Sequence, residues 1–104
     1  MSEFGIGTIR ETSPEVERRT KEPSLYKVIL LNDDYTTMDF VVHVLKTVFH
    51  KSEVEATRIM LHVHRNGEGV AGVYTRDIAE TKAERVHQMA RKESFPLRCR
   101  VERQ

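Results

Sequence analysis

The chain has 104 residues, enough for a single domain with one modest hydrophobic core. Its 17 Lys and Arg against 16 Asp and Glu give a formal net charge of +1, so no strong field draws in nucleic acid or an anionic membrane. One cysteine cannot form an internal disulfide, and no apolar run approaches the ~20 residues that span a bilayer. The N-terminus lacks the layout of a signal peptide, so we expect a cytoplasmic protein.

Residues 1–24 are predicted to form a flexible extension ahead of the domain. Large apolar residues are sparse there, glycine and proline recur, and residues 15–22 are mostly charged. Such a segment buries too little surface to offset the entropy that it loses on ordering. Composition alone favours a passive leader over an arm that reaches a partner.

The most apolar run of the chain predicts a buried strand over 26–32. Its residues are apolar at consecutive positions, which is typical of a strand covered on both faces. Thr36 and Asp39 then form a T-x-x-D pattern, which predicts a helix start. The apolar face of this first helix is expected to contain Met38, Val41, Val42, Leu45, Val48 and Phe49.

A second helix is predicted to start at Ser52, because Glu55 follows three residues later, and to end at Asn66-Gly67. Its inner face should contain Ala56, Ile59, Met60 and Val63. His62 and His64 are two residues apart and point away from each other on a helix. A shared metal site is therefore not expected, and nothing else in the sequence implies a metal or a cofactor.

The last third of the chain predicts a strand, a helix and a final strand. The strand covers 69–75, with its bulk from Val70, Val73 and Tyr74, and Thr75 is expected to cap a helix over 76–93 that Pro96 stops. The helix should bury Ala79, Ala83, Val86 and Ala90, with Ile78 and Met89 alongside. Alternation then predicts a half-buried strand in which Leu97, Cys99 and Val101 face inward. Cys99 is interpreted as a packing residue.

These elements predict a compact α+β domain with the order β-α-α-β-α-β. Three helices would cover one face of a three-stranded antiparallel sheet. We expect residues 1–24 to be the extension and residues 25–104 to be this domain. No internal repeat is visible.

Asn32, Asp33 and Asp34 occupy the loop between the first strand and the first helix. Such residues are ordinary turn formers, and a turn is the first interpretation of this stretch. A loop at the end of a buried strand is also a favourable place for a site. Asn, Asp and His side chains beside Met and Val would suit a small apolar pocket whose polar rim holds an ammonium group. The usual hydrolase and nucleotide-binding motifs are absent, but Asp33 with His64 leaves a small hydrolase open as an alternative.

Three blocks of the sequence, LYKVILLNDDYTTMDFVVHVL, ATRIMLHVH and GVYTRDIAETK, resemble the ClpS family of bacterial N-end rule adaptors. The similarity runs from about Ser24 to the C-terminal strand. The resemblance implies the same α+β domain with a variable N-terminal extension. It also implies binding of proteins that begin with Leu, Phe, Tyr or Trp, and their delivery to the AAA+ unfoldase ClpA and its peptidase ClpP.

The resemblance implies roles for matching positions. The substrate α-amino group and first peptide bond would be held by Asn32, Asp33 and His64. The side-chain pocket would be lined or bordered by Asp34, Thr36, Met38, Val41, Met60, Val63 and Leu97. Docking on the N-terminal domain of ClpA would use Glu80, Thr81 and Lys82.

Within that set of roles, the resemblance makes Met38 the gate against β-branched residues and the extension an arm that engages the unfoldase. Thr37 stands where many family members have proline, which leaves the first helical turn less rigidly preset. The protein is expected to act as a monomer, without nucleic acid or membrane. Two further readings stay open: a nucleic-acid binder, for which the candidate cluster is Arg98, Arg100 and Arg103, and a structural subunit without an open pocket.

Overall fold

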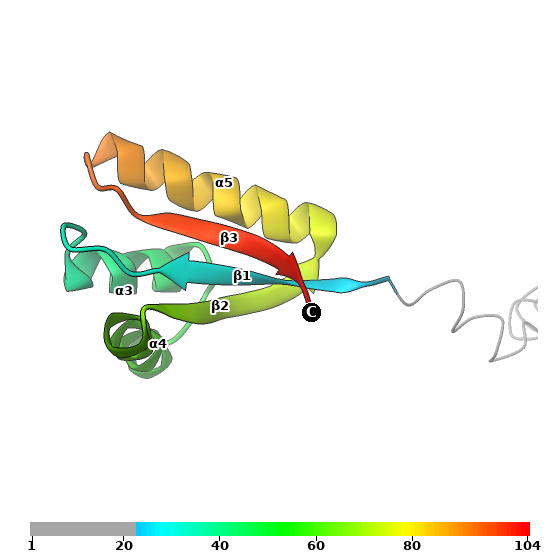
Figure 1. Ribbon diagram of the computed structural model, residues 1–104, viewed down its shortest axis with the longest axis horizontal. Helices are drawn as coiled ribbons and strands as arrows, with labels where there is room; N and C mark the ends of the chain where they lie inside the picture. The colour runs from blue at the N-terminus through cyan, green and yellow to red at the C-terminus, as the bar shows by residue number, and fades with distance from the viewer. Residues whose placement is uncertain (1–22) are drawn as a thin grey trace, which may run out of the picture.

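The computed structural model describes residues 23–104, so that of the predicted extension all but Pro23 and Ser24 lies outside the described residues (Figure 1). The elements are β1 (Leu25–Leu31), α3 (Met38–Thr47), α4 (Glu53–Asn66), β2 (Glu68–Thr75), α5 (Arg76–Lys92) and β3 (Arg98–Arg103). Their order confirms the predicted β-α-α-β-α-β arrangement. No helix within residues 23–104 is both long and apolar enough to cross a membrane.

The three strands form one antiparallel sheet in the order β2-β1-β3, with β1 in the centre (Figure 1). Val28 and Leu30 of β1 are fully buried in the core beneath the helices. The helices cover only one face, as predicted, yet β1 is buried on both faces. On the other face Ile29 is still only 3% exposed. The Arg100 side chain, opposite Ile29 on β3, reaches across β1 to Glu68 on β2 at 3.2 Å. This ion pair shields the face from solvent, although no helix covers it.

A bulge in β2 decides which of its side chains face the core. Val28 pairs with Gly72 and Ile29 with Val70, so Ala71 is an extra residue opposite β1. Gly69 and Ala71 are buried, whereas Val70 and Val73 are exposed. The two valine side chains therefore lie on the face of the sheet that the helices do not cover. A Cβ on Gly69 would approach Val63 Cγ2 to 2.9 Å, so this glycine lets β2 lie close against α4.

Local signals fixed both ends of α4. The Ser52 hydroxyl accepts the Glu55 N–H at 3.2 Å, as the capping pattern predicted. Gly67 has the left-handed φ of 91°, and its N–H donates to Val63 at 2.9 Å. Both predictions are confirmed, because each cap depends only on neighbouring residues.

The other helix ends differ from the prediction by small amounts. The N-cap of α3 is Thr37, whose hydroxyl accepts the Phe40 N–H at 3.1 Å, and not Thr36. Thr75 stands at the N-cap position of α5 but makes no side-chain cap bond. That helix ends at Lys92, before Pro96, because the chain turns through Ser94 with a φ of 62°.

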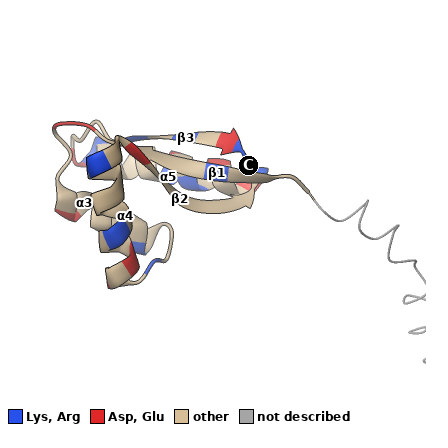
Figure 2. Cartoon of the chain, turned by 60° about the horizontal axis from the view of Figure 1, so that its bottom comes forward, with Lys and Arg blue, Asp and Glu red and all other residues tan. Residues whose placement is uncertain are grey.

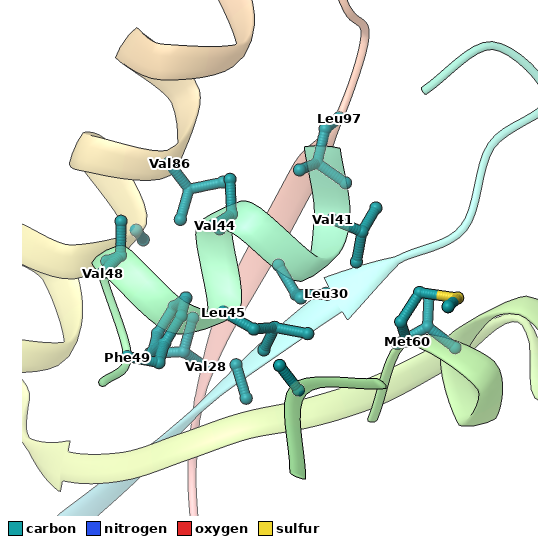
Figure 3. Packing of buried hydrophobic residues seen from close by; sticks show 14 of the residues in the cluster. Val28, Leu30, Val41, Val44, Leu45, Val48, Phe49, Met60, Val86 and Leu97 are labelled. Atoms are coloured by element: carbon teal, nitrogen blue, oxygen red, sulfur yellow. The ribbon is translucent and has the colours of Figure 1, made fainter. Parts of the chain in front are cut away.

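The core lies between the sheet and all three helices (Figure 3). Its largest fully buried side chains are Leu30, Leu45, Val28, Val44 and Val86. Val44 was not among the residues expected on the inner face of α3, whereas Met38 was expected there and is 45% exposed. The buried stripe of α3 is thus rotated away from its first residue, which leaves Met38 at the surface beside the acidic loop.

Candidate functional site

A pocket of about 210 Å³ lies where the end of β1, the first turn of α3 and the second half of α4 meet. We call it the β1–α4 pocket. It is lined by Asn32, Asp33, Asp34, Thr36, Met38, Val41, Met60, Val63 and His64. All nine are among the site residues that the sequence and the family resemblance pointed to, and no lining residue was missed. One residue expected at the pocket, Leu97, does not line it. Leu97 is 3% exposed and belongs to the core cluster that also contains Val41.

One backbone hydrogen bond joins the two sides of the pocket. The Asn32 N–H donates to the Gly67 carbonyl oxygen at 2.9 Å, which ties the end of β1 to the C-terminal cap of α4. Gly67 reaches this position because its left-handed conformation reverses the chain after Asn66. The bond brings the loop that follows β1 next to the last turn of α4, where His64 lies.

Asp33 organises the loop between β1 and α3. Its Oδ1 accepts the backbone N–H groups of Tyr35 at 2.8 Å and Thr36 at 2.6 Å, and its Oδ2 accepts the Thr36 hydroxyl at 2.8 Å. Partial burial acts to raise the pKa of Asp33, but the hydrogen bonds from Thr36 and Tyr35 outweigh it and hold the pKa below the ordinary 3.8. The turn interpretation of Asp33 is therefore confirmed. One acceptor direction of Oδ2 stays open to a ligand.

The remaining polar groups on the rim are not used by the fold. Within residues 23–104 the side chains of Asn32, Asp34 and His64 make no hydrogen bond to another protein group, and all three are exposed. An amide oxygen, a carboxylate and an imidazole nitrogen are acceptors. Their convergence on one opening suits a ligand that carries several N–H donors and a positive charge.

The wall of the pocket is apolar. Val41, Met60 and Val63 are buried core residues that continue into its floor. Met38 lies on the rim with 45% of its surface exposed, and its unbranched side chain has several rotatable bonds. The pocket thus combines a rigid apolar floor with one adaptable side chain at the opening. It fits a single apolar side chain attached to a charged, hydrogen-bonding group.

The arrangement gives no support to a hydrolase. Asp33 is bonded to Thr36 and Tyr35, and no hydrogen bond joins it to His64. The one hydroxyl that lines the pocket belongs to Thr36 and donates to Asp33, whose lowered pKa makes its carboxylate a weak base for activating a nucleophile. Among residues 23–104, no group of three or more His, Cys, Asp or Glu side chains is arranged to hold a metal ion.

The expected docking residues lie on another part of the molecule, along the first half of α5. Glu80 is paired with Arg76 at 3.2 Å. Thr81 is exposed, and Lys82 is partly buried and donates to the Val48 carbonyl oxygen at 2.7 Å. None of the three lines the β1–α4 pocket.

Charges of both signs are interspersed over the described surface (Figure 2). In the only candidate basic cluster, Arg100 is paired with Glu68 and Glu102, and Arg103 donates to Ser24 at 2.7 Å. These arginines are therefore partly neutralised or engaged, which gives no support to a nucleic-acid interface.

Comparison with known proteins agrees with this geometry. The family model described as "ATP-dependent Clp protease adaptor protein ClpS" matches residues 21–100. An ATP-dependent Clp protease adapter protein ClpS from Syntrophus aciditrophicus is 58% identical over 93 residues, which is 89% of this chain and 87% of that protein. Its counterpart from Caulobacter vibrioides is 54% identical over 99 residues, covering 95% and 89% of the two chains.

A solved structure is also similar. Agrobacterium tumefaciens ClpS2 bound to L-phenylalaninamide superimposes with a TM-score of 0.77 and is 48% identical. The match covers 80% of this chain and 100% of that one. The ligand of that protein carries an amine and an aromatic side chain on the same carbon atom.

Proposed function

This chain belongs to the ClpS family of Clp protease adaptor proteins, and we propose that its β1–α4 pocket binds the N-terminal residue of substrate proteins. Asn32, Asp33 and His64 would hold the α-amino group and first peptide bond. The side chain of an N-terminal Leu, Phe, Tyr or Trp would enter between the apolar walls, with Asp34, Thr36 and Met38 at its border. Bound substrates would pass to the ClpA unfoldase and the ClpP peptidase.

The observation that carries this proposal is the pairing of unused acceptors with an apolar floor in one small opening. Burying a Leu or Phe side chain contributes roughly 1.5–3 kcal/mol. Each hydrogen bond from the charged amine adds roughly 1.5–3 kcal/mol. Two or three such bonds, less the entropy lost on binding, bring an affinity near −8 kcal/mol, or about 1 μM, within reach.

We further propose that Glu80, Thr81 and Lys82 contribute to docking on the N-terminal domain of ClpA, and that residues 1–24 engage the unfoldase during hand-off. The extension would then be an arm, as the family resemblance implies. Deleting residues 1–24 should leave peptide affinity unchanged and slow degradation of a Phe-initiated substrate by ClpA and ClpP. Weaker peptide binding by the truncated protein would contradict a separate delivery role.

The proposed role is binding without catalysis, by a monomer in the cytoplasm. The adaptor function of the family supports binding without catalysis, as does the weak basicity of Asp33, the carboxylate that accepts the Thr36 hydroxyl. Turnover of a bound peptide by the purified protein would contradict the non-catalytic part of the proposal.

The decisive experiment uses matched peptides that differ only at the N-terminus. A fluorescent peptide that begins with Phe should bind, and the same peptide with an acetylated α-amine should not, because the rim would then face a neutral amide. A third peptide that begins with Ser, with a free amine, tests the apolar wall and should bind at least about tenfold more weakly. Equal binding of the free and acetylated Phe peptides would exclude the amine site.

A further inference from the structure

A second pocket, of about 150 Å³, lies between the C-terminal end of α3 and the first half of α5. We call it the α3–α5 pocket. Its lining residues are Thr47, Val48, His50, Thr81, Lys82 and Arg85. Thr81 and Lys82 are expected docking residues, whereas His50 and Arg85 were not singled out from the sequence. The pocket joins the proposed docking face of α5 to the connection between α3 and α4.

Internal contacts fix two walls of this pocket. Lys82 donates to the Val48 carbonyl oxygen at 2.7 Å, and its ammonium lies 5.2 Å from the centre of the Tyr74 ring. On the other side His50 adopts a φ of 58°, and the following N–H, of Lys51, donates to the Leu45 carbonyl oxygen at 3.0 Å. The Lys82 bond joins α5 to the residue after α3, and the Lys51 bond closes the turn that contains His50, so contacts of the fold position both sides of the pocket.

The lining is cationic and contains no acid. Lys82 and Arg85 carry positive charges, and no Asp or Glu is among the lining residues. The charge of Lys82 is directed at the carbonyl oxygen of Val48, the C-cap residue of α3, where the helix end carries partial negative charge. Arg85 is exposed and forms no ion pair with any residue in 23–104.

The acidic residues nearest to Arg85 on its helix are already engaged. Glu80 is paired with Arg76 at 3.2 Å. Glu84 accepts from Gln88 at 3.3 Å and lies 3.6 Å from Arg91. Asp77, which borders a neighbouring hollow of α5 together with Arg85, forms no ion pair with it. The described fold thus pairs Glu80 and Glu84 with other partners and leaves the Arg85 guanidinium unpaired within residues 23–104.

We propose that the α3–α5 pocket accepts an acidic side chain of the unfoldase, and that Arg85 is its principal ligand. A guanidinium matches a carboxylate with two parallel hydrogen bonds, and a shallow, partly enclosed pocket reduces the screening of that pair by solvent. His50 and Thr81 supply further polar groups at its rim. The inference rests on the proposed docking function of α5 and extends the docking surface onto the connection between α3 and α4.

The test measures binding of the full-length adaptor to the ClpA hexamer, assembled with a slowly hydrolysed ATP analogue, at low and higher salt, roughly 50 and 200 mM. Arg85→Gln should weaken binding by about three- to tenfold, Arg85→Glu should weaken it more, and Arg85→Lys should retain most of it. The loss in Arg85→Gln should shrink at the higher salt. Lys92→Gln removes a charge from the same helix outside the pocket, from an exposed residue without an ion pair in 23–104, and should change binding by less than about twofold.

Phe-peptide affinity is measured in parallel and should be unchanged in every variant, which shows that each is folded. Wild-type binding by Arg85→Gln, or an equal loss in Lys92→Gln, would overturn the proposed carboxylate site while leaving the unfoldase assignment intact. Failure of the wild-type protein to bind ClpA would refute both the unfoldase assignment and the site. Phe-peptide binding would stand separately from either result.

Discussion

Asp33 and Thr36 are joined twice: the carboxylate accepts the Thr36 backbone N–H at 2.6 Å and the Thr36 hydroxyl at 2.8 Å. The pair closes the loop between β1 and α3 on the side of the β1–α4 pocket. The same carboxylate is thereby a structural anchor and one of the proposed ligands of the substrate amine. Experiment can separate the two roles, because the anchoring role makes the stability of the substrate-free protein depend on pH.

The first prediction concerns that anchor. Because the pKa of Asp33 is lowered in the folded protein, its stabilising contribution is present above the unfolded value of 3.8 and is lost as the pH falls through the lower folded value. Asp33→Asn should reduce stability by about 1 kcal/mol near neutral pH, since the group is partly exposed, and the difference from wild type should shrink as the pH falls below 3.8. Urea denaturation across this range measures it, and a difference that persists in acid would exclude the charge as its cause.

The second prediction concerns Met38 as a gate. Met38→Ala should admit peptides that begin with Val or Ile and narrow the preference for Phe over Val by about tenfold, because rejection of branched side chains is steric. Peptide titrations by fluorescence anisotropy provide the measurement. Val54→Ala is the matched control, since Val54 is an exposed apolar residue, 70% accessible, outside the lining of the β1–α4 pocket. Unchanged rejection of Val by Met38→Ala would place the gate elsewhere.

The third prediction concerns His64 and pH. A neutral imidazole accepts a hydrogen bond from the substrate ammonium, whereas a protonated one loses the acceptor and places a cation beside a cation. Affinity for a Phe-initiated peptide should therefore decline on the acid side of neutral pH. It should also decline gradually on the alkaline side, as the free amine, which titrates near ~7.7–8.0, loses its proton.

Two histidine variants test whether His64 causes the acid-side decline in affinity. His64→Ala should weaken binding near neutral pH and remove the acid-side decline. His62→Ala should keep the decline, since His62 lies on the same helix outside the pocket and contacts Asn66. An acid-side decline that is unchanged in His64→Ala would point to Asp33 or another group.

The fourth prediction concerns Cys99 and His87. The Cys99 N–H donates to His87 Nε2 at 3.1 Å, and burial raises the pKa of the Cys99 thiol to about 11. The thiol should therefore react slowly with a disulfide reagent near pH 8 and quickly once the protein is unfolded. His87→Leu should destabilise the fold by about 1 kcal/mol, because an edge-strand N–H loses its acceptor, whereas His87→Gln should retain most of the stability. Equal stability of the Leu and Gln variants would show that the bond contributes nothing.

The fold was predictable wherever a short-range signal acts alone. Ser52 and Gly67 bound α4 as expected because each cap is closed by residues within a few positions. At Thr36 and Thr37 the sequence offers two adjacent hydroxyls, and only the three-dimensional loop decides between them, since Asp33 engages Thr36. Which side chains of β2 face inward was not predictable for a related reason. Simple alternation would place Val70 and Val73 on opposite faces, but the bulge at Ala71 places both on the outer face.

The candidate site was predictable in its membership more than in its geometry. Family motifs pointed to every lining residue of the β1–α4 pocket, but not to the bond from Asn32 to Gly67 that joins its two sides. Leu97 was expected at the pocket and instead lies in the core, because alternation places a side chain on a face of a strand without saying how deep it lies. Arg85 escaped notice because a single exposed arginine on a helix has no distinguishing pattern, and only the pairing of its neighbours shows that it is available.

The direction of β1 gives the domain a polarity. The N-terminal segment joins the strand at Leu25, next to the last residues of β3, whereas the β1–α4 pocket begins just beyond Leu31 at the other end (Figure 1). Seven strand residues separate the two points by about 23 Å. A polypeptide bound in the pocket and the attachment point of the N-terminal segment would therefore lie at opposite ends of β1, and the length of this strand would set the distance between them.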